Sequence, residues 1–338
     1  KLDSSLPSHL FKWGLLISNP PHCPSMFFIS TFLIYAQGIF VLGLPFALVQ
    51  SGYVGLVLLV LSAWFCNHTG RILVACLYEE EQRCDYYILL IWCQLAICNT
   101  KILLVMLYCL SRASSWSWSS LSLSVDPEDF LVSVGVIIFS YTSQIFLPSL
   151  EGSMEDRGQF NAMLGWTHGA ACIMKTLFSL LAVLTWGTET SEVITDNLPS
   201  DLRPLVNLSL LAKALLSYPL PFYSAAEILQ TCLHHITTLY SPSGRGVSRT
   251  ALLVRTALLM TSYLLALLVP RFSLLMGLTG SVTGSVMTLI LPCLLHLRLQ
   301  WGRLTVEERL IDVCILSLGA ICSVSGVICS VKRLVGGM

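Results

Sequence analysis

The sequence predicts an all-α polytopic membrane protein, and three observations support that fold class. Of the 338 residues, 55% are hydrophobic and only 11% are charged, and the mean hydropathy is +0.75. Soluble domains carry about 25% charged residues, so this chain has too few charges to cover a water-exposed surface. The apolar residues form runs of about 20 residues without alternation, which predicts spanning helices rather than a β-barrel. Two of these runs are interrupted by helix-breaking residues, as in helices that line a cavity.

The same composition excludes several classes of protein. A water-soluble enzyme and a disordered chain are excluded because charges are few and hydrophobic residues are many. The 19 basic and 19 acidic residues balance to zero net charge, so no nucleic-acid partner is expected. Ten of the 13 cysteines lie inside apolar runs, without metal-ligand spacing, so we expect no disulfide scaffold, metal site or cofactor.

Four apolar windows fill the first half of the chain, after an atypical segment (1–25) that resembles neither a signal peptide nor a targeting helix. Window 26–50 carries no charge, and a short Ser-Gly turn separates it from window 52–78. Window 86–110 contains only Lys101, and window 132–153 is uncharged until Glu151 near its end. Each is long enough to cross a bilayer.

Five more windows follow, and four of them contain isolated charges. Lys175 is the only charge in the fifth window, and the sixth contains Lys213 and Glu227. The seventh contains Arg255, the eighth is uncharged, and the ninth contains Asp312. These windows cover 163–186, 204–230, 251–270, 272–297 and 311–331. The sequence therefore predicts one membrane domain over 26–331 with about nine helices.

Loop charges predict the orientation of these helices, because basic residues gather in cytosolic loops. The loops after the sixth and eighth windows are basic and face the cytosol if the first window begins there. The loop 188–203 is acidic and then faces the cell exterior or an organelle lumen. The basic residues are Arg245, Arg249, Arg298, Arg303 and Arg309, and the acidic residues are Glu189, Glu192, Asp196 and Asp201.

Two windows are interrupted near their middle. In the first, Pro45 lacks an N–H group and Gly43 relaxes the backbone, so the helix is expected to unwind there. In the fourth, the polar run 140–144 is followed by Pro148. Unpaired backbone groups are costly in hydrocarbon, so such breaks persist where they line a cavity.

These breaks form the candidate substrate site. Freed N–H groups suit a carboxylate and freed carbonyl groups suit an ammonium ion. We expect the two breaks to lie close together near the membrane midplane. The alternative is a proline kink with ordinary Ser/Thr bonding to the helix backbone. The candidate binding residues are Gly43, Leu44, Pro45, Ser140, Tyr141, Ser143 and Gln144.

Two charged residues are candidates for proton coupling. Glu151 is either a proton carrier or substrate-amine partner, or an ordinary charge at a helix end. Lys213 lies about 13 Å along its helix from Pro204, and a lysine near the midplane is costly unless it is paired. Histidine as a residue type changes charge near neutral pH, so His168 and His296 are also considered. Packing at the membrane interface is the commoner role for such residues.

Nine stretches of sequence, covering about residues 37–80 and 105–331, are distinctive enough to compare with known families. They are QGIFVLGLPFALVQSGYVGL (37–56), HTGRILVACLYEE (68–80), YCLSRA (108–113), FSYTSQIFLPSLEGSM (139–154), WTHGAAC (166–172), EVITDNLP (192–199), AKALLSYPLPF (212–222), LLMGLTGS (274–281) and ICSVSG (321–326). They resemble the amino acid/auxin permease family. EVITDNLP and AKALLSYPLPF resemble its vesicular carriers for GABA and glycine in particular.

The resemblance implies a LeuT-like inverted-repeat transporter fold, with two repeats of five helices and one further helix. It implies a proton-coupled antiporter, not an enzyme, that moves GABA and glycine from the cytosol into synaptic vesicles. Its partners are these amino acids, protons from a vesicular pump gradient and the lipid bilayer. The implied location is the synaptic vesicle membrane, with the N-terminus in the cytosol.

The chain departs from that family between residues 82 and 110, where the family has three membrane passes and this sequence has one. The first repeat then lacks two helices, which leaves the downstream orientation unchanged because an even number of crossings is lost. One wall of the cavity should be missing, so we expect this chain to transport poorly.

Two other functions stay open at this point. The chain is alternatively another proton-coupled neutral amino acid carrier of the plasma membrane or lysosome, or a non-transporting membrane protein. An intramembrane enzyme is disfavoured, because HExxH, GxSxG and paired intramembrane aspartates are absent from the sequence.

Overall fold

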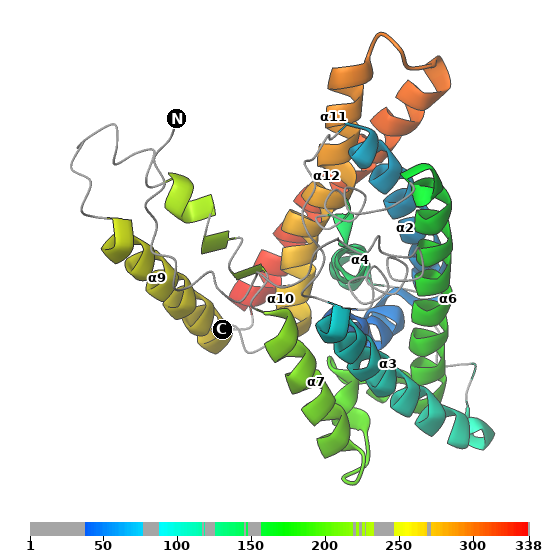
Figure 1. Cartoon of the computed structure of the whole chain (residues 1–338). Coiled ribbons are helices and arrows are strands. Elements are labelled where there is room, and N and C mark those ends of the chain that lie inside the picture. Colours follow the sequence, from blue (N-terminus) through cyan, green and yellow to red (C-terminus); the bar gives the residue numbers. More distant parts are fainter. Residues whose placement is uncertain are drawn as a thin grey trace.

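A computed structural model describes most of the chain from residue 38 onward, and every regular element in the described residues is helical (Figure 1). The described residues are 38–76, 88–116, 118, 126–144, 147, 157–218, 221–222, 225–226, 228–232, 247–268 and 272–336. The segment 1–25, the start of the first window, Glu151 and Glu227 lie outside them.

The α-helices are α2 (Leu44–Cys76), α3 (Ile88–Ser111), α4 (Pro127–Ser140), α6 (Phe160–Trp186), α7 (Arg203–Ser217), α9 (Val247–Leu268), α10 (Phe272–Thr279), α11 (Leu291–Gln300) and α12 (Val306–Gly336). Short 3₁₀ helices are η1 (Ile39–Gly43), η2 (Ala113–Ser115), η5 (Arg157–Gln159), η6 (Gly187–Glu189) and η7 (Ile194–Asn197). Two π-helical segments, η8 (Gly280–Gly284) and η9 (Val286–Ile290), join α10 to α11.

Four helical segments in the described residues are long and apolar enough to cross a membrane: Phe40–Cys76, Phe160–Glu189, Phe272–Gln300 and Val306–Arg333. Asn99–Ser111 and Leu252–Leu267 are shorter apolar helices. The predicted class of helical, multi-pass membrane protein is therefore confirmed. The count of nine spans and the bounds of the domain stay predictions.

The first two sequence windows meet at a sharp kink. Gly52 is buried and has φ 55° and ψ −146°, so the backbone turns there within the segment assigned as α2. This conformation is almost restricted to glycine, since a side chain would collide with the backbone. The short Ser-Gly turn expected between the two windows is thus present as a single-residue kink.

Replacing Gly52 with alanine is expected to lower the free energy of unfolding by about 1–3 kcal/mol, because the new side chain is strained at this φ. The thermal midpoint of the detergent-purified chain measures the loss. Gly169→Ala is the matched control, because nothing lies within 4 Å of a Cβ added at that exposed position of α6. Equal midpoints for the two variants would contradict the kink.

Helix α4 lies at the centre of the bundle, where it is seen end-on in Figure 1. Asp126 caps its first turn by accepting a hydrogen bond from the Glu128 N–H at 2.9 Å, and Pro127 occupies the position where a missing N–H does no harm. α4 packs against α2 on one side and against α10 and η8 on the other. Its residues from Val132 to Ile138 are all buried, as expected for a central helix.

The contact of α4 with α10 and η8 is a contact between backbones. A Cβ added to Gly280 would lie 2.0 Å from the Gly135 carbonyl oxygen, and one added to Gly135 would lie 2.5 Å from the Gly277 oxygen. Small residues allow membrane helices to approach this closely. The three glycines therefore fix how near α4 lies to the π-helical segment.

Helix α12 is tied to the bundle at both ends. Near its C-terminal end, Lys332 pairs with Glu128 and Arg333 pairs with Asp129, both at the start of α4. Asp129 also accepts a hydrogen bond from the Gln50 amide at 3.3 Å. Near its N-terminal end, Asp312 contacts α2 and α11.

Candidate functional site

The fourth window breaks where the sequence predicts. α4 ends at Ser140, and the Tyr141 and Thr142 N–H groups bond back to the Ile138 and Phe139 oxygens at 3.0 and 3.1 Å. The Ser143 N–H then donates to the Tyr141 oxygen at 2.8 Å, which closes a tight turn instead of continuing the helix. The polar run therefore ends the helix inside the bundle.

The first window shows a milder irregularity than expected. Residues Ile39–Gly43 form the 3₁₀ helix η1, and a regular α-helix starts at Leu44. Pro45 lies in the first turn of that helix, where its missing N–H leaves no hydrogen bond unmade. The prediction that the helix unwinds at 43–45 is therefore wrong. The backbone instead changes from 3₁₀ to α geometry there.

The two irregular segments lie side by side, as the sequence predicts. η1 contacts α4, and the Phe40 and Phe139 rings have centroids 4.2 Å apart. Leu42 and Leu44 share a buried cluster with Tyr141. All seven candidate binding residues are buried, so the two breaks meet in the protein interior.

Lys175 of α6 reaches the broken end of α4, although the sequence does not single it out as a site residue. Its ammonium group donates a 2.6 Å hydrogen bond to the Ser140 carbonyl oxygen and lies 3.5 Å from the centroid of the Tyr141 ring. The side chain is 1% exposed, and none of the described carboxylates lies within ion-pair distance of it. The available signal was a single lysine in an otherwise uncharged window.

Gln144 holds the turn against α2. Its amide NH₂ donates to the Cys66 carbonyl oxygen at 3.3 Å and to the Thr69 hydroxyl at 3.2 Å. Its amide oxygen is buried and has no hydrogen-bond partner within the described part of the chain. The buried Tyr141 hydroxyl has no such partner there either, beyond the weakly polar Cys172 thiol beside it. Buried polar atoms are normally satisfied, so these two atoms beside a broken helix are candidates to bind a polar ligand.

The acidic loop after α6 covers η1. A Cβ added to Gly43 would lie 3.2 Å from the Met276 sulfur and 3.8 Å from the Glu192 carbonyl oxygen. The Glu192 carboxylate accepts a hydrogen bond from the Ser273 N–H at 3.1 Å, at the start of α10. This part of the loop is therefore folded onto the bundle and closes one end of the site.

The other charged candidates lie elsewhere. Glu151 is outside the described residues. Lys213 is buried in α7, which packs against α3, where Lys101 is also buried. His168 is buried in α6 and its Nδ1 donates to the Leu164 carbonyl oxygen at 3.1 Å, as in ordinary packing. The ammonium group that contacts the break is thus that of Lys175, not that of Lys213.

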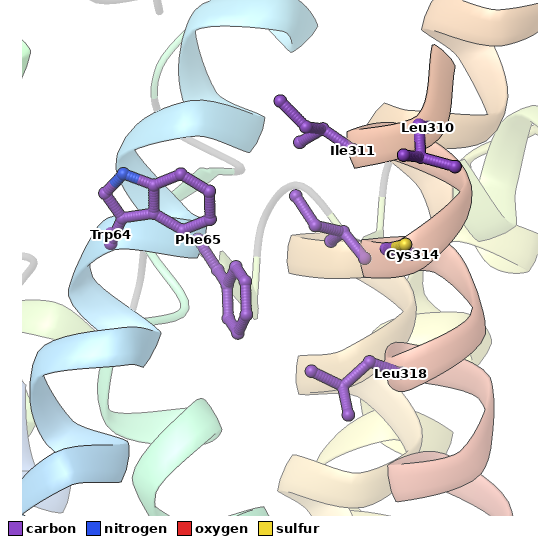
Figure 2. A pocket seen from close by; sticks show the side chains of 7 residues that line it. Trp64, Phe65, Leu310, Ile311, Cys314 and Leu318 are labelled. Carbon is purple, nitrogen blue, oxygen red and sulfur yellow. The ribbon is translucent and has the colours of Figure 1, made fainter. Parts of the chain in front are cut away.

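A groove of about 210 Å³ opens between α2 and α12, away from the breaks (Figure 2). Its lining is apolar, so it suits hydrocarbon and not a charged small molecule. It is lined by Trp64, Phe65, Leu310, Ile311, Cys314, Ile315 and Leu318. We therefore place the candidate site at the breaks and not in this groove.

Known proteins resemble the chain over most of its length. The family model described as transmembrane amino acid transporter protein matches residues 26–91 and 85–332. The vesicular inhibitory amino acid transporters of Homo sapiens and Xenopus tropicalis are each 39% identical over 88% of this chain, and the match covers 74% and 75% of their own lengths. The vesicular GABA transporter of Caenorhabditis elegans is 32% identical over 88% of this chain and 77% of its own length.

The family match covers the described helices and both irregular segments, and the relatives are transporters and not enzymes. The chain therefore belongs to the family of transmembrane amino acid transporters.

Proposed function

We propose that the chain is a proton-coupled antiporter for GABA and glycine, and that its substrate binds between η1 and the broken end of α4. The observation that carries this proposal is the contact of Lys175 with the Ser140 carbonyl and the Tyr141 ring, beside the unpartnered Gln144 amide oxygen. The named relatives support the substrate class, because they are called vesicular inhibitory amino acid transporter and vesicular GABA transporter.

The proposed site matches both ends of an amino acid. The buried Lys175 ammonium and the Tyr141 hydroxyl attract and bind the carboxylate, since a buried cation is strongly stabilised by an anion. The Gln144 amide oxygen accepts a hydrogen bond from the substrate ammonium group. Gly43, Leu44, Pro45, Ser140 and Ser143 shape the walls. Glu151 and Lys213 stay candidates for proton coupling, and Lys175 joins them.

For proton-driven exchange we propose an acidified vesicle as the location, with the first span beginning in the cytosol and the loop 188–203 in the lumen. The acidic loop supports this orientation, and so do Arg298, Arg303 and Arg309, which lie around the connection between α11 and α12. The synaptic vesicle is the location that the relatives' names support best.

An epitope inserted at Asp201 is expected to resist protease in sealed vesicles and to be cleaved after detergent is added. Asp201 is exposed in the turn before α7, whereas Glu192 is engaged with Ser273, so insertion at Asp201 disturbs the fold less. An epitope at Gly302, where a Cβ would meet nothing within 4 Å, is the control and should be cleaved without detergent. The reverse pattern would invert the proposed orientation.

We further propose that the first repeat of this chain lacks two helices. The human alignment runs over 389 positions, whereas 88% of 338 residues is about 297, so the relative carries residues that this chain does not. The two family matches, 26–91 and 85–332, overlap at 85–91, where the sequence predicts the loss. An inverted-repeat carrier moves one group of helices around a fixed central site, so a missing wall should impair transport.

Uptake of labelled GABA and glycine into acid-loaded liposomes tests the function. A version with the human relative's segment in place of residues 82–107 is expected to accumulate both amino acids. The chain as printed is expected to stay near the protein-free background, because its cavity lacks one wall. Accumulation of other neutral amino acids instead would favour the alternative carrier. Equal uptake by both versions would refute the missing-wall proposal.

The alignment also supports a second candidate, a membrane protein that does not transport. If the cavity is incomplete, the chain can bind substrate without moving it across the membrane. If neither the original chain nor the restored version takes up GABA or glycine, although both are folded, this second candidate is favoured over the antiporter.

A further inference from the structure

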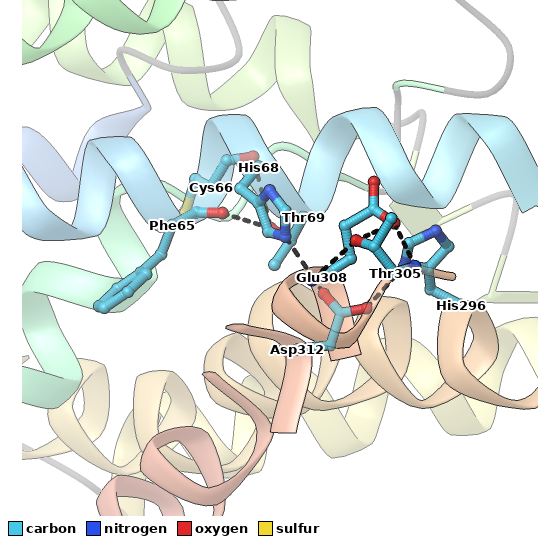
Figure 3. A network of polar contacts seen from close by, with 8 residues as sticks. All are labelled: Phe65, Cys66, His68, Thr69, His296, Thr305, Glu308 and Asp312. Atoms are coloured by element: carbon cyan, nitrogen blue, oxygen red, sulfur yellow. Dashed lines mark hydrogen bonds and ion pairs between the residues drawn. The ribbon is translucent and has the colours of Figure 1, made fainter. Parts of the chain in front are cut away.

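A second polar cluster lies in the C-terminal part of α2, where that helix meets α11 and α12 (Figure 3). Asp312, in the second turn of α12, is fully buried, and each of its carboxylate oxygens contacts a different histidine. His68 Nε2 of α2 lies 3.1 Å from Oδ1, and His296 Nδ1 of α11 lies 2.6 Å from Oδ2. Three helices therefore meet at one carboxylate.

The charge of this cluster depends on bound protons. With both imidazoles neutral, each ring donates one N–H to the carboxylate and the cluster carries one buried negative charge. A single added proton on either ring makes the cluster neutral, which removes the cost of a buried net charge. Histidine as a residue type gains and loses a proton near neutral pH, so the two rings are the groups of this cluster suited to carry it.

Other ionisable groups surround the cluster on each of the three helices. Cys76 of α2 and Cys293 of α11 are thiols within electrostatic range of Asp312. Glu308 of α12 is within electrostatic range of both histidines, but its Oε2 accepts two 2.9 Å hydrogen bonds from the N–H and hydroxyl of Thr305. Glu308 therefore caps α12 and leaves the histidines to take up the proton.

The exposure of the three side chains gives the proton a route. The His68 side chain is 26% exposed and that of His296 is 10% exposed, whereas that of Asp312 is 1% exposed. The cluster lies four residues before the end of α11 and six residues after the start of α12, beside the connection that carries Arg303. It is thus near the end of the bundle for which the loop charges predict a cytosolic position.

We propose that His68, Asp312 and His296 form a proton-binding site through which the carrier exchanges protons with the cytosolic side. This inference rests on the proposed proton-coupled function and gives it a location that neither Glu151 nor Lys213 provides. One proton binds to an imidazole nitrogen and leaves from it again, and no covalent bond between heavy atoms changes. The ligand is a proton and not a metal ion, since the two rings contact opposite oxygens of one carboxylate. Within the described chain no group of three such side chains is arranged to hold a metal ion.

Proton counting on the purified full chain in lipid nanodiscs tests the site without transport. Between pH 8 and pH 5.5, the chain is expected to take up about one proton more than Asp312→Asn, because the amide no longer stabilises a protonated ring. The double variant His68→Gln/His296→Gln, which removes both rings, should show the same loss. His168→Gln is the matched control, because that buried ring bonds to the Leu164 carbonyl and not to a carboxylate. Equal proton uptake by Asp312→Asn and the original chain would overturn the proposal.

Transport by the version with restored helices separates this proposal from the proposed function. Asp312→Asn is expected to lose proton-driven GABA accumulation while retaining GABA exchange at equal pH on both sides. If the restored version itself shows no proton-driven GABA accumulation, the antiport proposal is refuted. The proton count in nanodiscs would then still show whether His68, Asp312 and His296 bind a proton. Unchanged accumulation by a folded Asp312→Asn variant would overturn the site. The double variant His68→Gln/His296→Gln gives the same comparison if Asp312→Asn does not fold.

Discussion

Gly280→Ala is expected to leave little folded protein in the membrane. The added Cβ would lie 2.0 Å from the Gly135 carbonyl oxygen and 2.7 Å from its carbonyl carbon, and both are backbone atoms that cannot rotate away. α4 must then move outward, which also disturbs Ser140 and Tyr141 at its end. Overpacking of this kind typically costs about 1–3 kcal/mol and more where the backbone blocks relaxation.

Gly284→Ala is the matched control for this prediction. It lies in the same π-helical segment, four residues further on, but its added Cβ would come no closer than 3.4 Å to Ile138 or Thr142. The monodisperse fraction on size exclusion and the thermal midpoint measure both variants. We expect Gly284→Ala to match the original chain, and an equally stable Gly280→Ala would contradict the close contact of α4 with η8.

Lys175→Met is expected to abolish substrate binding while the protein stays folded. If the ammonium group binds the substrate carboxylate, its loss removes a buried, charge-assisted contact worth about 2–5 kcal/mol, or roughly 30-fold or more in affinity. Removing an isolated buried charge relieves its desolvation cost, so thermal stability should be retained or rise. GABA-induced stabilisation of the chain in detergent measures binding without requiring transport.

Lys332→Met is the control for loss of a lysine. Lys332 forms an ion pair with Glu128 in which both side chains are largely exposed, and such pairs contribute about 0–1 kcal/mol. Substrate binding should be unchanged in this variant. If Lys175→Met still bound GABA and glycine with the original affinity, the proposed site would be wrong. If that variant kept its affinity but lost thermal stability, Lys175 would have a purely structural role at the end of α4.

The sequence predicts the break in α4 well and the irregularity before α2 less well. A polar run from Ser140 to Gln144 inside an apolar window offers many side-chain competitors for the helix hydrogen bonds, so the local residues alone end the helix. Pro45 could either kink a helix or begin one, and these outcomes have the same local sequence. Only the chain before it decides between them.

The residues that give the site its charge are harder to predict. Lys175 is one isolated lysine in a long window, and its contact with Ser140 depends on how α6 packs against α4. The two histidines and Asp312 are even less visible, because 244 residues separate His68 from Asp312 and no motif joins them. The π-helical segments η8 and η9 also leave no signal in an uncharged window, since their wider turns follow from tertiary contacts.

The two attachments of α12 differ in how ionic strength affects them. Lys332 and Glu128 are exposed, with 66% and 41% of their side-chain surface accessible, so dissolved salt screens the charges that hold this end. Asp312 and its two histidines are shielded by the bundle, so salt screens the other end far less. Raising the salt concentration should therefore weaken the ion pairs near the C-terminal end of α12 and leave the contacts of Asp312 with its two histidines largely unchanged, while the helix stays packed in the bundle.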